Sequence, residues 1–148
     1  MAYRVFLDAD VLIAAFQGES QLRECALAIL SEPLDFWYSP LLCMEVMIQP
    51  TYHRHTLELA FYNEYFTNAT CFGNLDGMFE IGSREALKHG IAVVDALHIA
   101  TAHLAKCAVL ITAEKQTKPM FRTKLVKVVT IIGRTKHASS LGKLLAER

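Results

Sequence analysis

Acidic residues stand in this sequence at positions where a carboxylate could do chemistry. Asp8 and Asp10 directly follow the apolar run 5–7, and Glu114 follows the apolar run 108–112. Glu45 and Asp95 are single acids in otherwise apolar stretches. A buried carboxylate needs a partner, because burying an unpaired charge costs much free energy. We therefore treat these acids as candidate catalytic or metal-binding groups.

The carboxyl ends of parallel strands meet at one edge of a sheet, where ligands bind in such folds. Acids that converge there repel one another, and a divalent cation is the usual reason that they persist. Oxygen ligands favour Mg²⁺ or Mn²⁺ over Zn²⁺. Each acid also has an ordinary structural interpretation: a turn residue at Asp8, an ion pair at Glu45, a helix cap at Asp95 and an exposed loop at Glu114.

The elements that must position these acids alternate between strands and helices. We predict strands at 3–7, 35–39, 67–72, 108–112 and 127–132, and helices at 20–31, 40–48, 51–66, 75–89, from about 95 to 105, and 139–147. Pro50 is expected to end one helix and Gly90 another. Such alternation implies right-handed crossovers. We predict a single α/β domain over 1–148, a three-layer α/β/α sandwich with a mainly parallel central sheet.

Composition supports a cytoplasmic, well-packed domain. The 148 residues are 53% hydrophobic, as expected for strands covered on both faces. No apolar run has the ~18–20 residues that span a bilayer, and the N-terminus does not read as a secretory signal. The four cysteines form no C-x-x-C pair, so we predict buried free thiols in a reducing cytoplasm. The spacing of the six histidines suggests no zinc site.

The net charge of zero hides a division along the chain. Residues 1–99 hold 5 Lys/Arg and 13 Asp/Glu, whereas residues 100–148 hold 10 and 2. A basic segment favours a polyanionic partner, since phosphate neutralisation dominates affinity for nucleic acids. The candidate phosphate-binding residues are Lys115, Lys118, Arg122 and Lys124. A solvated basic surface is the alternative interpretation.

Four segments, taken in order, resemble the motifs of PIN-domain proteins, among them the VapC-type ribonuclease toxins. They are Phe-Leu-Asp-Ala-Asp-Val-Leu-Ile at 6–13, Ser-Pro-Leu-Leu-Cys-Met-Glu-Val at 39–46, Val-Asp-Ala-Leu-His-Ile-Ala-Thr-Ala at 94–102 and Leu-Ile-Thr-Ala-Glu at 110–114. The resemblance covers residues 3–132. It implies a nuclease that uses Mg²⁺ or Mn²⁺ to hydrolyse RNA, with an antitoxin protein as a partner and a homodimer as the assembly.

The resemblance also implies roles for individual residues. Asp8, Glu45 and Asp95 match the three acids of the metal site, and Glu114 matches a fourth catalytic acid that is usually Asp. The supporting residues are Asp10, which matches a small polar position, Ser39, and Thr112, which matches a hydroxyl beside the fourth acid. Because Glu is one methylene longer than Asp, Glu114 alters that side of the site.

Two alternatives remain open on the sequence. A haloacid-dehalogenase-like phosphohydrolase would explain Asp8 and Asp10, but it would need an acidic pair after a later strand, and Gly133 and Arg134 follow the last one. A PIN-like binding scaffold with a degraded site would explain the substituted Glu114.

Overall fold

The computed structural model describes residues 2–135 and 140–146. Five strands form one parallel sheet in the order β3-β2-β1-β4-β5. The strands are β1 Arg4–Leu7, β2 Asp35–Tyr38, β3 Thr70–Cys71, β4 Val109–Thr112 and β5 Lys127–Thr130. The helices are α1 Ala9–Gln17, α2 Ser20–Leu30, α3 Pro40–Tyr52, α4 Thr56–Thr67, α5 Leu75–His89, α6 Val93–Leu104 and α7 Leu141–Ala146, with a 3₁₀ turn η1 at Pro119–Arg122.

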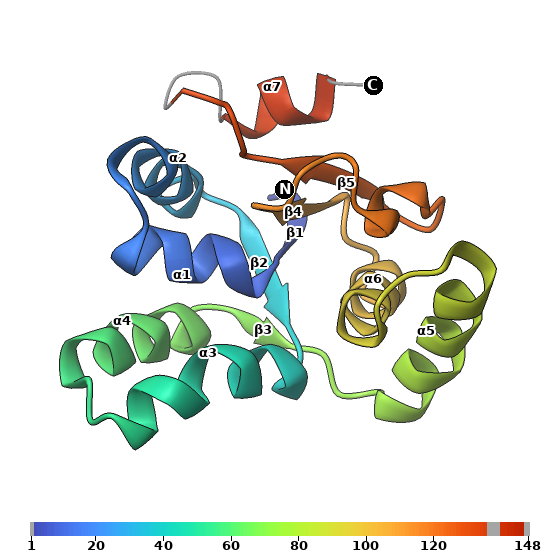
Figure 1. The fold of residues 1–148 in the computed structure, drawn as a ribbon, viewed down its shortest axis with the longest axis horizontal. Helices are drawn as coiled ribbons and strands as arrows, with labels where there is room; N and C mark the ends of the chain where they lie inside the picture. Colours follow the sequence, from blue (N-terminus) through green and yellow to red (C-terminus); the bar gives the residue numbers. More distant parts are fainter. Residues whose placement is uncertain (1, 136–139, 147–148) are drawn as a thin grey trace.

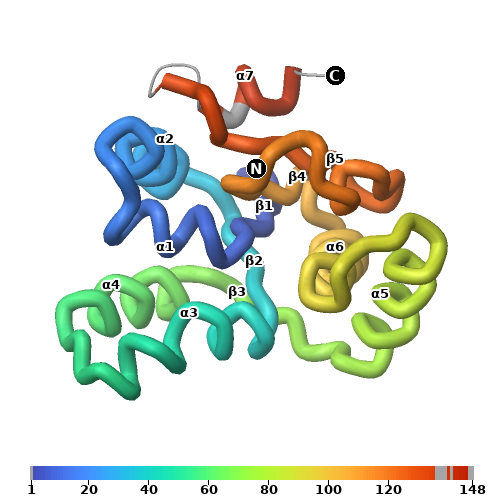
Figure 2. The backbone as a smooth tube through the Cα atoms, in the orientation of Figure 1, coloured from blue at the N-terminus to red at the C-terminus, as the bar shows by residue number. Residues whose placement is uncertain are grey.

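The sheet lies between two layers of helices, which confirms the predicted α/β/α sandwich. Figure 1 shows α1 to α4 on one side of the sheet and α5 and α6 on the other, and the tube in Figure 2 follows the same path. The central strand β1 contributes Val5, Phe6 and Leu7, which are all fully buried. Because every strand is parallel, all five carboxyl ends face one edge of the sheet. That edge receives the residues that follow each strand.

Gly90 ends α5 as predicted, with a left-handed φ of 67° that suits glycine. The prediction that Pro50 ends the preceding helix is wrong. Helix α3 continues through Pro50 to Tyr52, so Thr51 belongs to α3 and the next helix begins only at Thr56. The actual stop is Arg54, whose φ of 55° turns the chain while the amide of His55 donates to the Pro50 carbonyl at 2.8 Å. Pro50 has no N–H to donate to the carbonyl of Val46, so α3 lacks that one hydrogen bond but keeps its helical path for two more residues.

Other boundaries also differ from the prediction. Helix α6 begins at Val93 with Ala92 as its N-cap, so Asp95 lies in the first turn and is not the cap. Neither α1 nor η1 was predicted from the sequence. Helix α7 accounts for the predicted C-terminal helix at 141–146, whereas positions 139 and 147 lie outside the described residues.

All four cysteines are free thiols, as predicted. Only Cys25 is fully buried, however, and Cys71 is exposed, so the prediction of burial is wrong there. Cys71 belongs to β3, the two-residue strand at one edge of the sheet. Within the described residues, no helix combines the length and apolar character needed to cross a bilayer.

Candidate active site at the carboxyl edge of the sheet

Asp8 occupies the junction between β1 and α1, at the centre of the sheet edge. Its backbone is extended (φ −68°, ψ 156°), and its Oδ1 accepts a hydrogen bond from the Ala9 amide at 2.9 Å. The Asp8 amide donates to the carbonyl of Ile111 at 2.9 Å, which ties the junction to β4. The Asp8 side chain is only 5% exposed. The local fold thus fixes a nearly buried carboxylate at this edge.

Thr112 joins the ends of β1 and β4 through its hydroxyl. Its Oγ1 lies 2.9 Å from Asp8 Oδ2 and 3.3 Å from Asp10 Oδ2. A hydroxyl has one hydrogen, so Thr112 donates to the nearer oxygen of Asp8. The amide of Ala113 donates to Asp10 Oδ1 at 3.0 Å, and the amide of Glu114 donates to Thr112 Oγ1 at 3.2 Å. Asp10 and Thr112 therefore position the loop that carries Glu114.

Glu45 reaches the same edge from α3 and meets a histidine there. The Nε2 atom of His98, on α6, forms a hydrogen bond with Glu45 Oε1. The ring of His98 is fully buried against Phe6, with 5.0 Å between ring centroids, whereas the Glu45 side chain is 30% exposed. Oxygens of Asp8 and Glu45 and a ring nitrogen of His98 all lie within 4.8 Å of one another. Three elements distant in sequence thus converge on one point.

Asp95, one turn before His98 on α6, shares the electrostatic field of this cluster. Burial, followed by repulsion from Asp8, raises the pKa of Asp95 to about 6, with smaller contributions from Glu114 and Glu45. Burial likewise raises the pKa of Asp8, although His98 opposes that effect. Burial and the Asp8 charge raise the pKa of Asp10 to about 7. The site gathers more negative charge than the protein alone neutralises.

This donor set fits a hard divalent cation. Asp8, Glu45 and Asp95 offer carboxylate oxygens, the ligands that Mg²⁺ and Mn²⁺ prefer. Two of the buried polar atoms that have no hydrogen-bond partner among the described residues lie near these acids in the sequence. They are Ser39 Oγ, just before the helix that carries Glu45, and His98 Nδ1, one turn after Asp95. Ser39 is fully buried at the N-cap of α3 without making a capping bond. Unpaired buried polar groups of this kind are costly, and they are typical of functional sites.

The predicted basic residues lie in different surroundings. The Lys118 ammonium is 3.9 Å from Glu114 Oε2, and Arg122 Nη1 donates to the carbonyl of His89 at 2.8 Å. Both therefore have intramolecular partners. Lys124 is exposed beyond η1, and Lys115 lines a pocket beyond the end of β4.

His98 is the member of the cluster that the sequence analysis missed. Its spacing of five from His103 argued against a metal site, and its apolar neighbours are typical of a core residue. One signal was available: His98 lies three residues after Asp95, on the same helical face.

Two substitutions of His98 should separate its packing from its bond to Glu45. His98→Phe keeps a buried ring but removes the bond, and we expect about 10- to 100-fold weaker Mn²⁺ binding, as for other residues that orient a metal ligand. His98→Ala should also lower the free energy of unfolding by about 2–4 kcal/mol, because it leaves a cavity beside Phe6. Mn²⁺ titration calorimetry and urea unfolding measure the two effects. Wild-type Mn²⁺ affinity in His98→Phe would contradict a positioning role.

Comparison with known proteins places this geometry in a family. The family model described as PIN domain matches residues 5–120. A search of curated proteins found no significant match.

Solved structures with the same fold include three complexes. A toxin–antitoxin complex from Klebsiella pneumoniae has a TM-score of 0.66 and 22% identity, covering 82% of this chain and 94% of that chain. VapBC2 from Rickettsia felis, bound to a DNA fragment from their promoter, has a TM-score of 0.64 and 13% identity, and the match covers 86% of this chain and 98% of that chain. FitAcB from Neisseria gonorrhoeae has a TM-score of 0.58 and 18% identity, and the match covers 84% of this chain and 95% of that chain. At these identities the similarity shows a shared fold.

The matched segment, residues 5–120, contains Asp8, Glu45, Asp95 and Glu114. It also contains most of the sheet whose carboxyl edge carries them. The chain belongs to the PIN-domain family.

Proposed function

We propose that this protein is a Mg²⁺- or Mn²⁺-dependent endoribonuclease. The observation that carries the proposal is the cluster of Asp8, Glu45 and His98, whose ligand atoms lie within 4.8 Å of one another at one edge of a parallel sheet. Asp95 is close enough to this cluster for the Asp8 charge, after burial, to raise its pKa to about 6. These three acids would hold the cation, and Glu114 is proposed as the fourth catalytic acid. When bound, Mg²⁺ or Mn²⁺ supplies the Lewis acidity that neutralises phosphodiester charge and acidifies a coordinated water.

The remaining residues prepare the site for that chemistry. Thr112 and the Ala9 amide hold the two oxygens of Asp8 in fixed directions. His98 orients the Glu45 carboxylate in the same way. Such fixed orientation matters because a misplaced reacting group costs a large factor in rate.

Membership of the PIN-domain family removes the haloacid-dehalogenase-like alternative. A metal-free binding scaffold remains a second candidate, favoured by the hydrogen bond that occupies Glu45 and by Glu114 in place of Asp.

Metal binding decides between the nuclease and the scaffold. At 100 times the dissociation constant, Mn²⁺ should stabilise an intact site by about 2.7 kcal/mol, which raises the melting temperature by about 5–10 °C. Asp95→Asn should abolish this shift. Asp76→Asn is the matched control, because Asp76 is exposed on α5. Its neighbour Gly77 lies near Leu104, at the end of α6 opposite to the end that carries Asp95. A wild-type protein without a Mn²⁺ shift and without RNA cleavage would favour the scaffold.

We also propose a protein partner of the antitoxin type and a homodimer. One matched structure is a toxin–antitoxin complex, which supports the first. An exposed apolar row on α3 supports a protein interface: Met44, Ile48 and Tyr52, four residues apart, are 58%, 53% and 79% exposed. The molar mass of the purified protein, and of an Ile48→Glu variant, tests self-association.

A further inference from the structure

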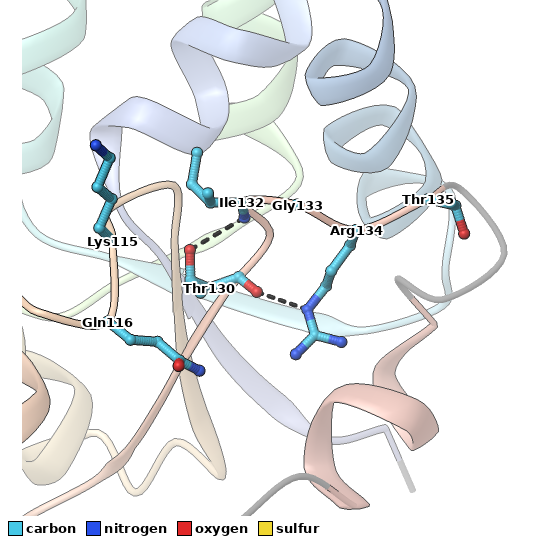
Figure 3. A pocket seen from close by; sticks show the side chains of 7 residues that line it. All are labelled: Lys115, Gln116, Thr130, Ile132, Gly133, Arg134 and Thr135. Carbon is cyan, nitrogen blue, oxygen red and sulfur yellow. Dashed lines mark hydrogen bonds between the residues drawn. The ribbon is translucent and has the colours of Figure 1, made fainter.

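A pocket of about 510 Å³ lies beside the acidic site, at the carboxyl ends of β4 and β5. Figure 3 shows the side chains that line it: Lys115, Gln116, Thr130, Ile132, Gly133, Arg134 and Thr135. We call it the β5-edge pocket. Its volume is within the usual range for sites that bind small organic molecules.

The β5-edge pocket adjoins the acids through one strand pair. Thr130 pairs in register with Thr112, and the Ile131 amide donates to the Thr112 carbonyl at 2.9 Å. The hydroxyl of Thr112 in turn contacts Asp8. Strand β4 separates β5 from β1, and neighbouring strands lie about 4.8 Å apart, so β5 lies about 10 Å from the strand that precedes Asp8.

A tight turn after β5 shapes the rim of the pocket. The Arg134 amide donates to the Ile131 carbonyl at 3.2 Å, and Gly133, with φ of 77°, occupies the position that requires glycine. A Cβ atom at Gly133 would meet nothing within 4 Å, so the backbone there faces open space. The carbonyl of Arg134 accepts hydrogen bonds from Gln21 and Cys25, which anchor the turn to α2. The rim is therefore built before any ligand arrives.

The lining combines two cations with an apolar surface. Arg134 Nε donates to the Thr130 carbonyl at 2.7 Å, which fixes the plane of the guanidinium (Figure 3). Within residues 2–135 and 140–146, no hydrogen bond or ion pair holds the Lys115 ammonium, and its side chain is exposed. Ile132 is 40% exposed, and Gln116 adds an amide. Cations bind phosphate, an apolar surface accepts a base, and an amide pairs with a base edge.

We propose that the β5-edge pocket binds one nucleotide of a single-stranded RNA, next to the phosphodiester held at the acids. Lys115 and Arg134, whose charged ends point apart in Figure 3, contact the two phosphates that flank the nucleotide, whereas Ile132 and Gln116 contact the base. A single strand fits better than a duplex, because only an unstacked base can enter a pocket of this size. The proposal rests on the proposed nuclease function and adds a subsite to it.

The salt dependence of RNA binding tests the two cations. A labelled short RNA is titrated in EDTA, without cleavage, over a range of KCl concentrations. Each lost phosphate contact should make the slope of log affinity against log salt shallower by about 0.7. Lys115→Gln and Arg134→Gln should each show this change, and Lys106→Gln, at the amino end of β4, should not. Should Arg134→Gln unfold, Lys115→Gln still tests the pocket, because its side chain is exposed and makes no contact that the fold needs.

The nature of the ligand is tested by chemical shifts. Uridine 5′-monophosphate should move the amide signals of Ile132, Gly133 and Arg134 at much lower concentrations than inorganic phosphate or uridine alone does. Equal effects of inorganic phosphate would overturn the nucleotide assignment, and so would shifts confined to other regions.

The two proposals can fail separately. If the wild type cleaves RNA with Mg²⁺ but neither cation affects the salt slope, the pocket proposal is wrong and the nuclease stands. If no cleavage occurs but the slopes change as expected, the pocket binds RNA and the nuclease proposal is wrong. A single-stranded DNA of the same sequence that binds more tightly than the RNA would overturn the choice of RNA.

Discussion

The Asp8→Asn variant is expected to lose metal-dependent RNA cleavage by about three orders of magnitude. The change removes a charged ligand at the centre of the site, and metal stabilisation of transition-state charge contributes several kcal/mol. The fold should survive, because asparagine has the same shape and its oxygen can still accept from the Ala9 amide, as Asp8 Oδ1 does at 2.9 Å. Cleavage of a labelled RNA with Mn²⁺, together with circular dichroism, measures both effects.

Asp76→Asn is the matched control for this experiment, because it makes the same chemical change on the exposed surface of α5. It should cleave at the wild-type rate. Cleavage by a rigorously purified Asp8→Asn protein at that same rate would exclude a direct role for Asp8.

A second large effect is expected on stability as the pH changes in the absence of metal. The folded-state pKa is about 7 for Asp10 and about 6 for Asp95, against 3.8 in an unfolded chain. Below pH ~3.8 both groups are protonated in both states. Between that pH and about 7 the folded protein retains protons that the unfolded chain has lost, so the free energy of unfolding falls as the pH rises. Above pH ~7 both groups are ionised in both states, so they lower the free energy of unfolding no further.

The total loss should be about 2–4 kcal/mol, since each pKa unit corresponds to about 1.4 kcal/mol and solvent screens the half-buried Asp95. About half of that loss falls above pH 5, so in EDTA the melting temperature at pH 8 should lie about 2–9 °C below its value at pH 5. Asp10→Asn should lessen the difference, and Mn²⁺ at pH 8 should reverse much of it. A melting temperature that rises from pH 5 to pH 8 in EDTA would show that folding does not raise the pKa of these carboxyl groups.

The sequence predicted the sheet and much of the acidic edge, because both depend on local patterns. Short apolar runs closed by polar residues marked the strands, and parallel topology alone then brought Asp8 and Glu114 to one edge. Glu45 and Asp95 stood out as single acids in apolar stretches, and the PIN-like motifs then implied their roles. The sequence did not reveal the element after Asp8, because the apolar stretch 9–16 continues the composition of the strand before it. An apolar run of that kind fits a buried helix as well as a strand.

What sequence could not predict depends on contacts between distant segments. The bond between His98 and Glu45 joins residues 53 positions apart, and nothing local marks either as the partner of the other. Arg134 belongs to a basic segment without a motif, and only the turn at Gly133 and the register of β5 place it in the lining of the β5-edge pocket. Pro50 is a third case, because the end of α3 is set by Arg54 four residues later.

The contact between Thr112 and Asp8 spans 104 residues, and β1 lies between β2 and β4 in the sheet. A ribosome that adds about 5–20 residues per second needs roughly 5–20 s to make the chain between these two residues. During that time β1 lacks its β4 neighbour, and Asp8 lacks the hydroxyl that orients it. The nascent chain therefore emerges with its acidic site unassembled, and the site can form only after Thr112 has been synthesised.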